Sequence, residues 1–176
     1  MIMPRGQQLL LPANPLFVLF TLLGALLINM FVNMSLVGNA AWMPDFLAVV
    51  LVFWCVHQPR LVGIGVAFFF GVATDVHQSA LLGEHALTYT VLGFLALMVH
   101  RRLLWFTVPS QALQVLPLFA AAHAIELLVR MLSGSLFPGW SIFLGPLLEA
   151  ALWPVVSVFL LAPQRRAPNP DANRPL

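Results

Sequence analysis

Residues 16–37 of the chain read LFVLFTLLGALLINMFVNMSLV, an apolar block long enough to cross a lipid bilayer. A hydrocarbon layer about 30 Å thick needs roughly 20 apolar residues per helix. The apolar core of a signal peptide has only about 7 to 15 residues. We therefore expect this block to be a retained membrane-spanning helix, even though the Asn39-Ala40-Ala41 that follows has the small residues of a cleavage site.

Apolar blocks of this kind continue along the chain. Hydrophobic residues make up 61% of the 176 residues and charged residues only 8%, which excludes a single water-soluble core. The blocks fall at about 16–37, 44–57, 61–74, 86–100, 110–132 and 141–162. We predict an all-α polytopic membrane protein with six transmembrane helices in a single domain over residues 1–162. Residues 163–176 are basic and rich in proline, which predicts a disordered cytoplasmic tail.

The second and third blocks are short for a full membrane span, at about 21 Å each. A re-entrant hairpin is the alternative, but it would place Arg60 at membrane depth, where a charged side chain is costly. We therefore predict two short helices that cross a locally thinned or well-packed region.

The arginines predict the orientation of the chain, because cytoplasmic loops collect basic residues. The sequence has no lysine, and seven of its eight arginines fall in segments that share one side of the predicted bundle. These are Arg5, Arg60, Arg101, Arg102, Arg165, Arg166 and Arg174. Only Arg130 lies near the other side. Both termini are therefore predicted to be cytoplasmic, and the basic residues indicate contact with the lipid bilayer rather than with nucleic acid.

Ionisable residues gather in the stretch GVATDVHQSALLGEHAL, residues 71–87, which this orientation places on the outer face. We expect it to be a loop with its charges in or near water. Asp75, which closes the third block, either bonds backbone amides of the loop or faces a partner protein. Asp45, beside Pro44, is predicted to cap the helix of the second block. The donor spacing matches no metal-binding pattern, so neither a metal site nor a cofactor is predicted.

A second polar group lies on one face of the segment 110–132, where His123, Glu126 and Arg130 follow at i, i+3 and i+7. Glu149, in the segment 141–162, lies at a comparable depth. Ionisable residues inside a membrane bundle face its interior and pair, so we expect a buried polar cluster with a structural ion pair between Glu126 and Arg130. A proton path and a partner-facing groove are the alternatives, although the inner halves of both segments are almost purely apolar.

Smaller features predict helix packing. Asn29 and Asn33 lie one turn apart and suit hydrogen bonds between helices, and the small residues Gly63, Gly65, Ala67 and Gly71 permit close approach of another helix. The chain contains no nucleophile elbow, phosphate loop, paired catalytic carboxylates or nucleotide-binding motif. The sequence therefore gives no catalytic residue and no reason to predict an enzyme.

Several of these residues together resemble the MreD family of bacterial cell-wall elongation proteins. The resemblance rests on Pro44-Asp45-Phe46-Leu47, on Gly71 with Asp75, and on Ser79-Ala80-Leu81-Leu82-Gly83-Glu84-His85-Ala86-Leu87. Leu152-Trp153-Pro154 and Leu160-Leu161-Ala162-Pro163-Gln164-Arg165-Arg166 look like the proteobacterial branch of the family.

The resemblance implies a non-catalytic, multi-pass scaffold of the bacterial inner (cytoplasmic) membrane. Its expected partners are MreC, a single-span periplasmic coiled-coil protein, and, directly or indirectly, MreB, the elongation transpeptidase and RodA. The resemblance also implies a fold similar to the substrate-binding membrane subunits of vitamin transporters. The candidate partner-binding residues are Asp45, Asp75, Leu82, Gly83, Glu84 and His85.

The alternative function is a solute-binding membrane subunit of a transporter. It requires a cavity with convergent polar groups, for which His123, Glu126, Arg130 and Glu149 are the candidates.

Overall fold

The computed structural model describes residues 13–35, 42–78 and 81–164. Within these ranges the regular structure is entirely helical. The helices are α1 (Pro15–Ser35), α2 (Phe46–His57), α3 (Ile64–Gln78), α4 (Glu84–Leu103), α5 (Val108–Leu132) and α6 (Leu144–Leu161), with the 3₁₀ helices η1 (Trp140–Phe143) and η2 (Ala162–Gln164). Each α-helix overlaps one predicted apolar block. Residues 163 and 164, assigned to the tail by the sequence, end η2, and the rest of that tail lies outside the described residues.

Three stretches of the described chain are long and apolar enough to cross a membrane: Pro15–Met34, Val108–Leu132 and Trp140–Gln164. The lateral surface is also apolar. Phe20 on α1, Phe69 on α3 and Phe159 on α6 are each about 70% exposed. Many large exposed apolar side chains of this kind mark a membrane or protein contact in a folded protein. Both observations fit a membrane protein.

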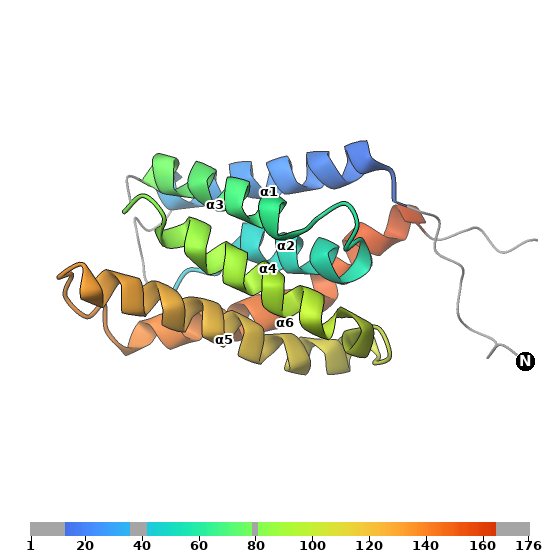
Figure 1. Cartoon of the computed structure of the whole chain (residues 1–176). Coiled ribbons are helices and arrows are strands. Elements are labelled where there is room, and N and C mark those ends of the chain that lie inside the picture. The colour runs from blue at the N-terminus through green and yellow to red at the C-terminus, as the bar shows by residue number, and fades with distance from the viewer. Residues whose placement is uncertain (1–12, 36–41, 79–80, 165–176) are drawn as a thin grey trace, which may run out of the picture.

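Helix α2 lies inside the bundle and is enclosed by its neighbours (Figure 1). Its ten residues from Leu47 to Val56 are all buried, and it packs against α1, α4 and α6. Trp54 is fully buried and donates a hydrogen bond from its indole to Thr21 on α1, at 2.9 Å. A helix that is apolar all round belongs in a core. The short block predicted at 44–57 is thus a helix packed against protein.

Helices α3 and α4 approach closely at Gly71. A Cβ atom added there would lie 2.7 Å from both the Ala86 nitrogen and the His85 carbonyl oxygen, closer than real contacts allow. Only glycine therefore permits this crossing. Of the predicted stripe of small residues, Ala67 and Gly71 are buried, whereas Gly63 and Gly65 would meet nothing within 4 Å.

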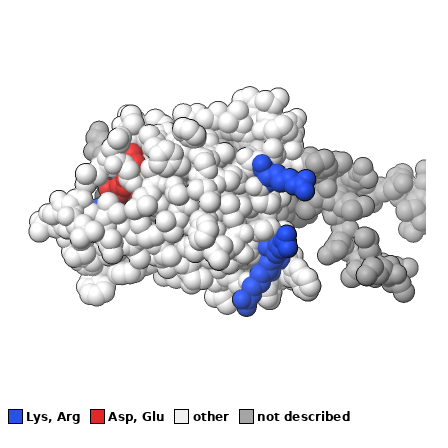
Figure 2. Space-filling model, viewed as in Figure 1, with Lys and Arg blue, Asp and Glu red and all other residues white. Residues whose placement is uncertain are grey.

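Apart from Arg130, the described acidic and basic side chains lie toward opposite ends of the bundle (Figure 2). At one end α1, α3 and α5 finish and α2, α4 and α6 begin. The described acidic residues lie in this half of the molecule, which we call the carboxylate end: Asp45, Asp75, Glu84, Glu126 and Glu149. The opposite end carries exposed Arg60, Arg101 and Arg102, and we call it the arginine end.

Candidate functional site

Asp45 connects three helices at the carboxylate end. As predicted, it caps α2, accepting a hydrogen bond from the Ala48 backbone N–H at 3.0 Å. The amide of Asn29 on α1 donates to the same carboxylate at 2.7 Å, and the Tyr89 hydroxyl on α4 donates to its second oxygen. Asn29 also accepts from the Phe46 backbone N–H at 3.2 Å. The predicted hydrogen bond between helices is therefore made by Asn29.

Glu149 extends this network to α5 and α6. Its Oε1 accepts the Asp45 backbone N–H at 3.0 Å and lies 3.6 Å from His123 Nε2. The Glu149 side chain is fully buried, and its Oε2 has no hydrogen-bond partner among the described residues. The His123 ring packs against Gly145, where an added side chain would displace the ring. Of the predicted polar cluster, His123 and Glu149 thus lie side by side where α5 and α6 pack together.

The prediction that residues 71–87 form a loop with charges near water is wrong. Asp75, Glu84 and His85 are 1%, 4% and 6% exposed, and only residues 79–83 separate α3 from α4. The reason lies in the Asp75 carboxylate, which accepts backbone N–H groups of Gly83, His85 and Ala86 at 2.8, 2.7 and 3.3 Å. It also lies 2.9 Å from the His85 ring.

Asp75 therefore does for α4 what a capping residue does for its own helix, but from the last turn of α3. Gly83, which precedes α4, has a φ of +106° and no capping side chain of its own. The prediction that Asp75 bonds nearby backbone amides is thereby confirmed. The amides that it binds lie at the N-terminus of α4.

Arg130 joins α5 to α4. Its guanidinium pairs with Glu126 at 2.5 Å, the i, i+4 ion pair that the spacing predicts, and also with Glu84 at the start of α4. His123, Glu126 and Arg130 keep 13%, 17% and 31% of their side-chain surface exposed, so Glu149 is the one fully buried member of the predicted cluster.

A cavity of about 520 Å³ opens among these groups at the carboxylate end. This volume lies within the range of small-molecule pockets. Six predicted site residues line it: Asp45, Glu84, His85, His123, Glu126 and Arg130. The remaining lining residues are Asn29, Asn33, Met43, Pro44, Gln78, Leu81, Ser135, Leu136, Pro138 and Ile142. Asp75, Leu82, Gly83 and Glu149 lie outside the lining, and Leu82 is 77% exposed.

Sequence reasoning missed Tyr89 and the cavity residues Gln78 and Leu136. Tyr89 is the only tyrosine of the chain and lies in an apolar helix. A buried hydroxyl needs a hydrogen-bond partner, so a tyrosine in this helix could have indicated a polar contact with another helix. The described part of the chain holds no cluster of three or more metal-binding side chains.

The chain is similar to a known family of bacterial proteins along most of its length. The family model for the rod shape-determining protein MreD matches residues 8–162. The chain belongs to the MreD family. The rod shape-determining protein MreD of Haemophilus influenzae is 28% identical over 134 residues, which cover 74% of this chain and 80% of that relative. No solved structure matches the chain. Membership in the MreD family supports a role in rod shape determination, and the apolar helices fit a membrane protein.

Proposed function

We propose that this MreD-family chain is a non-catalytic inner-membrane scaffold that binds MreC at the carboxylate end. Through MreC it links peptidoglycan synthesis by the elongation transpeptidase and RodA to the MreB cytoskeleton. The observation that supports this proposal is the cavity, which is open at one end of the bundle and has a lining fixed by hydrogen bonds and ion pairs.

The orientation belongs to the same proposal. All six helices cross the membrane, with both termini and the arginine end in the cytoplasm. Exposed Arg60, Arg101 and Arg102 support this arrangement, because basic loops stay inside. Arg130, at the carboxylate end, is paired with two carboxylates and thus adds no free positive charge there. The cavity then opens toward the periplasm.

The lining of the cavity suits a peptide segment. Polar groups such as Asn33 and Gln78 lie beside apolar Met43, Leu136 and Ile142, so a segment with both kinds of side chain can be accommodated. A single-span partner leaves the membrane next to this opening, and its first periplasmic residues can enter the cavity. Glu84 and Glu126 are already paired with Arg130, and Asp45 is held by Asn29 and Tyr89. Little ordering of the charged lining is therefore needed on binding.

Filling the cavity tests this role. Gln78→Trp, at the cavity wall, is expected to reduce the MreC that co-purifies with the tagged chain in mild detergent by about tenfold, which corresponds to about 1.4 kcal/mol. Gln114→Trp is the matched control, since Gln114 lies in the half of α5 nearer the arginine end and outside the cavity. Both variants should melt like the unmodified chain. Undiminished MreC capture by a well-folded Gln78→Trp chain would contradict the proposed site.

The second candidate function, solute binding for a transporter, is favoured by the same convergence of polar groups in a cavity of suitable volume. It predicts that mass spectrometry of the denatured, purified chain detects a released small molecule that Gln78→Trp loses. The scaffold function predicts that no small molecule is released from either chain and that Gln78→Trp lowers MreC capture alone.

A further inference from the structure

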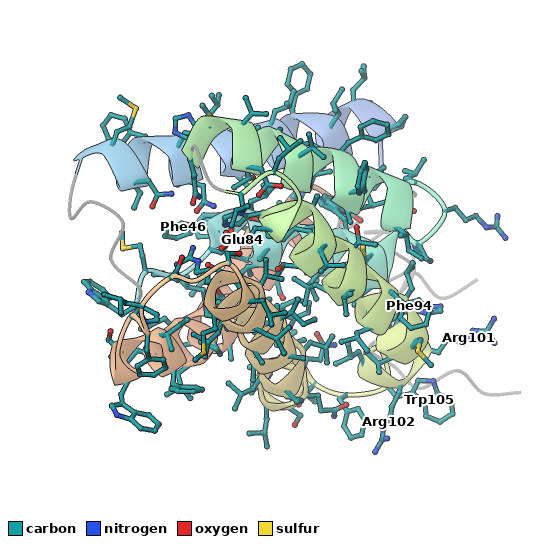
Figure 3. The ribbon with its side chains drawn as sticks, turned by 60° about the vertical axis from the view of Figure 1, so that its left-hand side comes forward. Phe46, Glu84, Phe94, Arg101, Arg102 and Trp105 are labelled. Atoms are coloured by element: carbon teal, nitrogen blue, oxygen red, sulfur yellow. The ribbon has the colours of Figure 1, made fainter. Side chains whose placement is uncertain are left out.

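An arginine and aromatic turn closes α4 at the arginine end. Arg101 and Arg102 end the helix with exposed side chains, and Trp105 and Phe106 follow with 90% and 42% of their surface exposed. Figure 3 shows Arg101, Arg102 and Trp105 projecting outward from this end of the helix. The mechanism proposed for the cavity at the opposite end uses none of these residues.

The turn is held in place by its own backbone. The Leu104, Trp105 and Phe106 N–H groups donate to the carbonyls of His100, Arg102 and Leu103 at 3.2, 3.2 and 3.1 Å. Leu103 is buried and anchors the turn to the core, and the Gln111 side chain donates to the Phe106 carbonyl at 3.0 Å. The four side chains are therefore presented together by an ordered turn.

Neither Arg101 nor Arg102 has an ion-pair partner in the described parts of the chain. The described carboxylates all lie in the other half of the molecule. A shallow hollow of about 470 Å³, with a mostly apolar exposed lining, is bordered by Arg101, Arg102, Trp105 and Phe106. Two guanidinium groups that have no carboxylate partner among the described residues are complementary to an anion, and their planar fork matches the oxygens of a phosphate.

We infer that this turn binds the headgroup phosphate of an anionic phospholipid in the membrane leaflet at the arginine end. The aromatic residues favour a lipid over a dissolved phosphate or an acidic protein segment. Trp and Phe side chains that protrude beside the phosphate level can place their rings at the boundary between headgroups and acyl chains. This inference goes beyond the scaffold function and depends only on the placement of the chain in a membrane.

The test measures the lipid retained by the full chain. The protein is purified in detergent with equal amounts of phosphatidylglycerol and phosphatidylcholine, and the lipids that remain bound are counted by native mass spectrometry. The unmodified chain should retain phosphatidylglycerol preferentially. R101Q and R102Q should each lower that retention at least threefold, as should Trp105→Ala, which leaves both charges in place.

R60Q is the matched control, because Arg60 is an exposed arginine at the same end that does not line the hollow. It should lower retention less than 1.5-fold. Equal losses in R60Q, R101Q and R102Q would overturn the site in favour of general charge attraction. Equal retention of both lipids by the unmodified chain, with binding of a hexaglutamate peptide, would assign the surface to an acidic protein segment. A further outcome is that excess inorganic phosphate releases the lipid while retention still depends on both arginines. That result would overturn the proposal by showing a phosphate site without lipid specificity.

Discussion

Gly71→Val is expected to lower the melting temperature of the purified chain by about 6 to 12 °C. The first atom of the new side chain meets the backbone of Ala86 and His85, which cannot move aside as the end of a flexible side chain would. Overpacking costs about 1 to 3 kcal/mol, and we expect the upper end of that range here. One kcal/mol corresponds to about 2 to 4 °C for a domain of this length. Separation of α3 from α4 would also stretch the hydrogen bonds of Asp75.

Gly65→Val is the matched control for Gly71→Val. Both positions lie in α3, but a side chain at Gly65 would meet nothing within 4 Å. Both variants carry the free-energy cost of placing a β-branched residue in a helix. The difference between their melting temperatures therefore reports the destabilisation caused by the clash between α3 and α4. Equal melting of the two variants would show that the helices do not approach at Gly71 as described.

Asp75→Ala is expected to destabilise the chain by about 3 to 5 kcal/mol, a fall in melting temperature of about 6 to 20 °C. Removal of the carboxylate leaves buried backbone N–H groups of Gly83 and His85 without an acceptor, each at a cost of about 1 to 3 kcal/mol. The His85 ring loses its partner as well. Thermal melting in detergent and the steady-state amount of protein in the membrane should fall together.

His77→Ala serves as the control, since His77 lies on the same helix, is half-buried and makes none of these contacts. It should change stability by less than about 0.5 kcal/mol. Of the two roles that the sequence left open for Asp75, contact with a partner protein predicts instead that Asp75→Ala weakens complex formation without preventing membrane insertion. That earlier expectation would regain support if Asp75→Ala lost MreC while melting like the unmodified chain.

Hydrophobic patterning predicted the helical membrane class and the approximate place of each helix, because apolar blocks of helical length have few other uses. Local spacing also predicted the Asp45 cap and the Glu126–Arg130 pair, whose partners lie within four residues. The patterning could not reveal that α2 is the enclosed helix. An apolar helix in protein and one in lipid have the same composition.

The errors concern contacts between distant parts of the chain. Asp75 binds amides 8 to 11 residues away across a helix boundary, so its role could not be read from either helix alone. Tyr89 meets Asp45 across 44 residues, and Arg130 meets Glu84 across 46. These pairs exist only because the helices cross at one end, and no periodicity in the sequence encodes that crossing.

The most direct test of the proposed scaffold role is photo-crosslinking in cells with a benzophenone amino acid at position 136. Leu136 lines the cavity and is 94% exposed, whereas Trp105, 90% exposed at the arginine end, provides the control position. We predict a covalent product with MreC from position 136 at several times the yield from position 105. A chain that supports rod shape but gives no MreC product from position 136 would contradict the placement of MreC in the cavity.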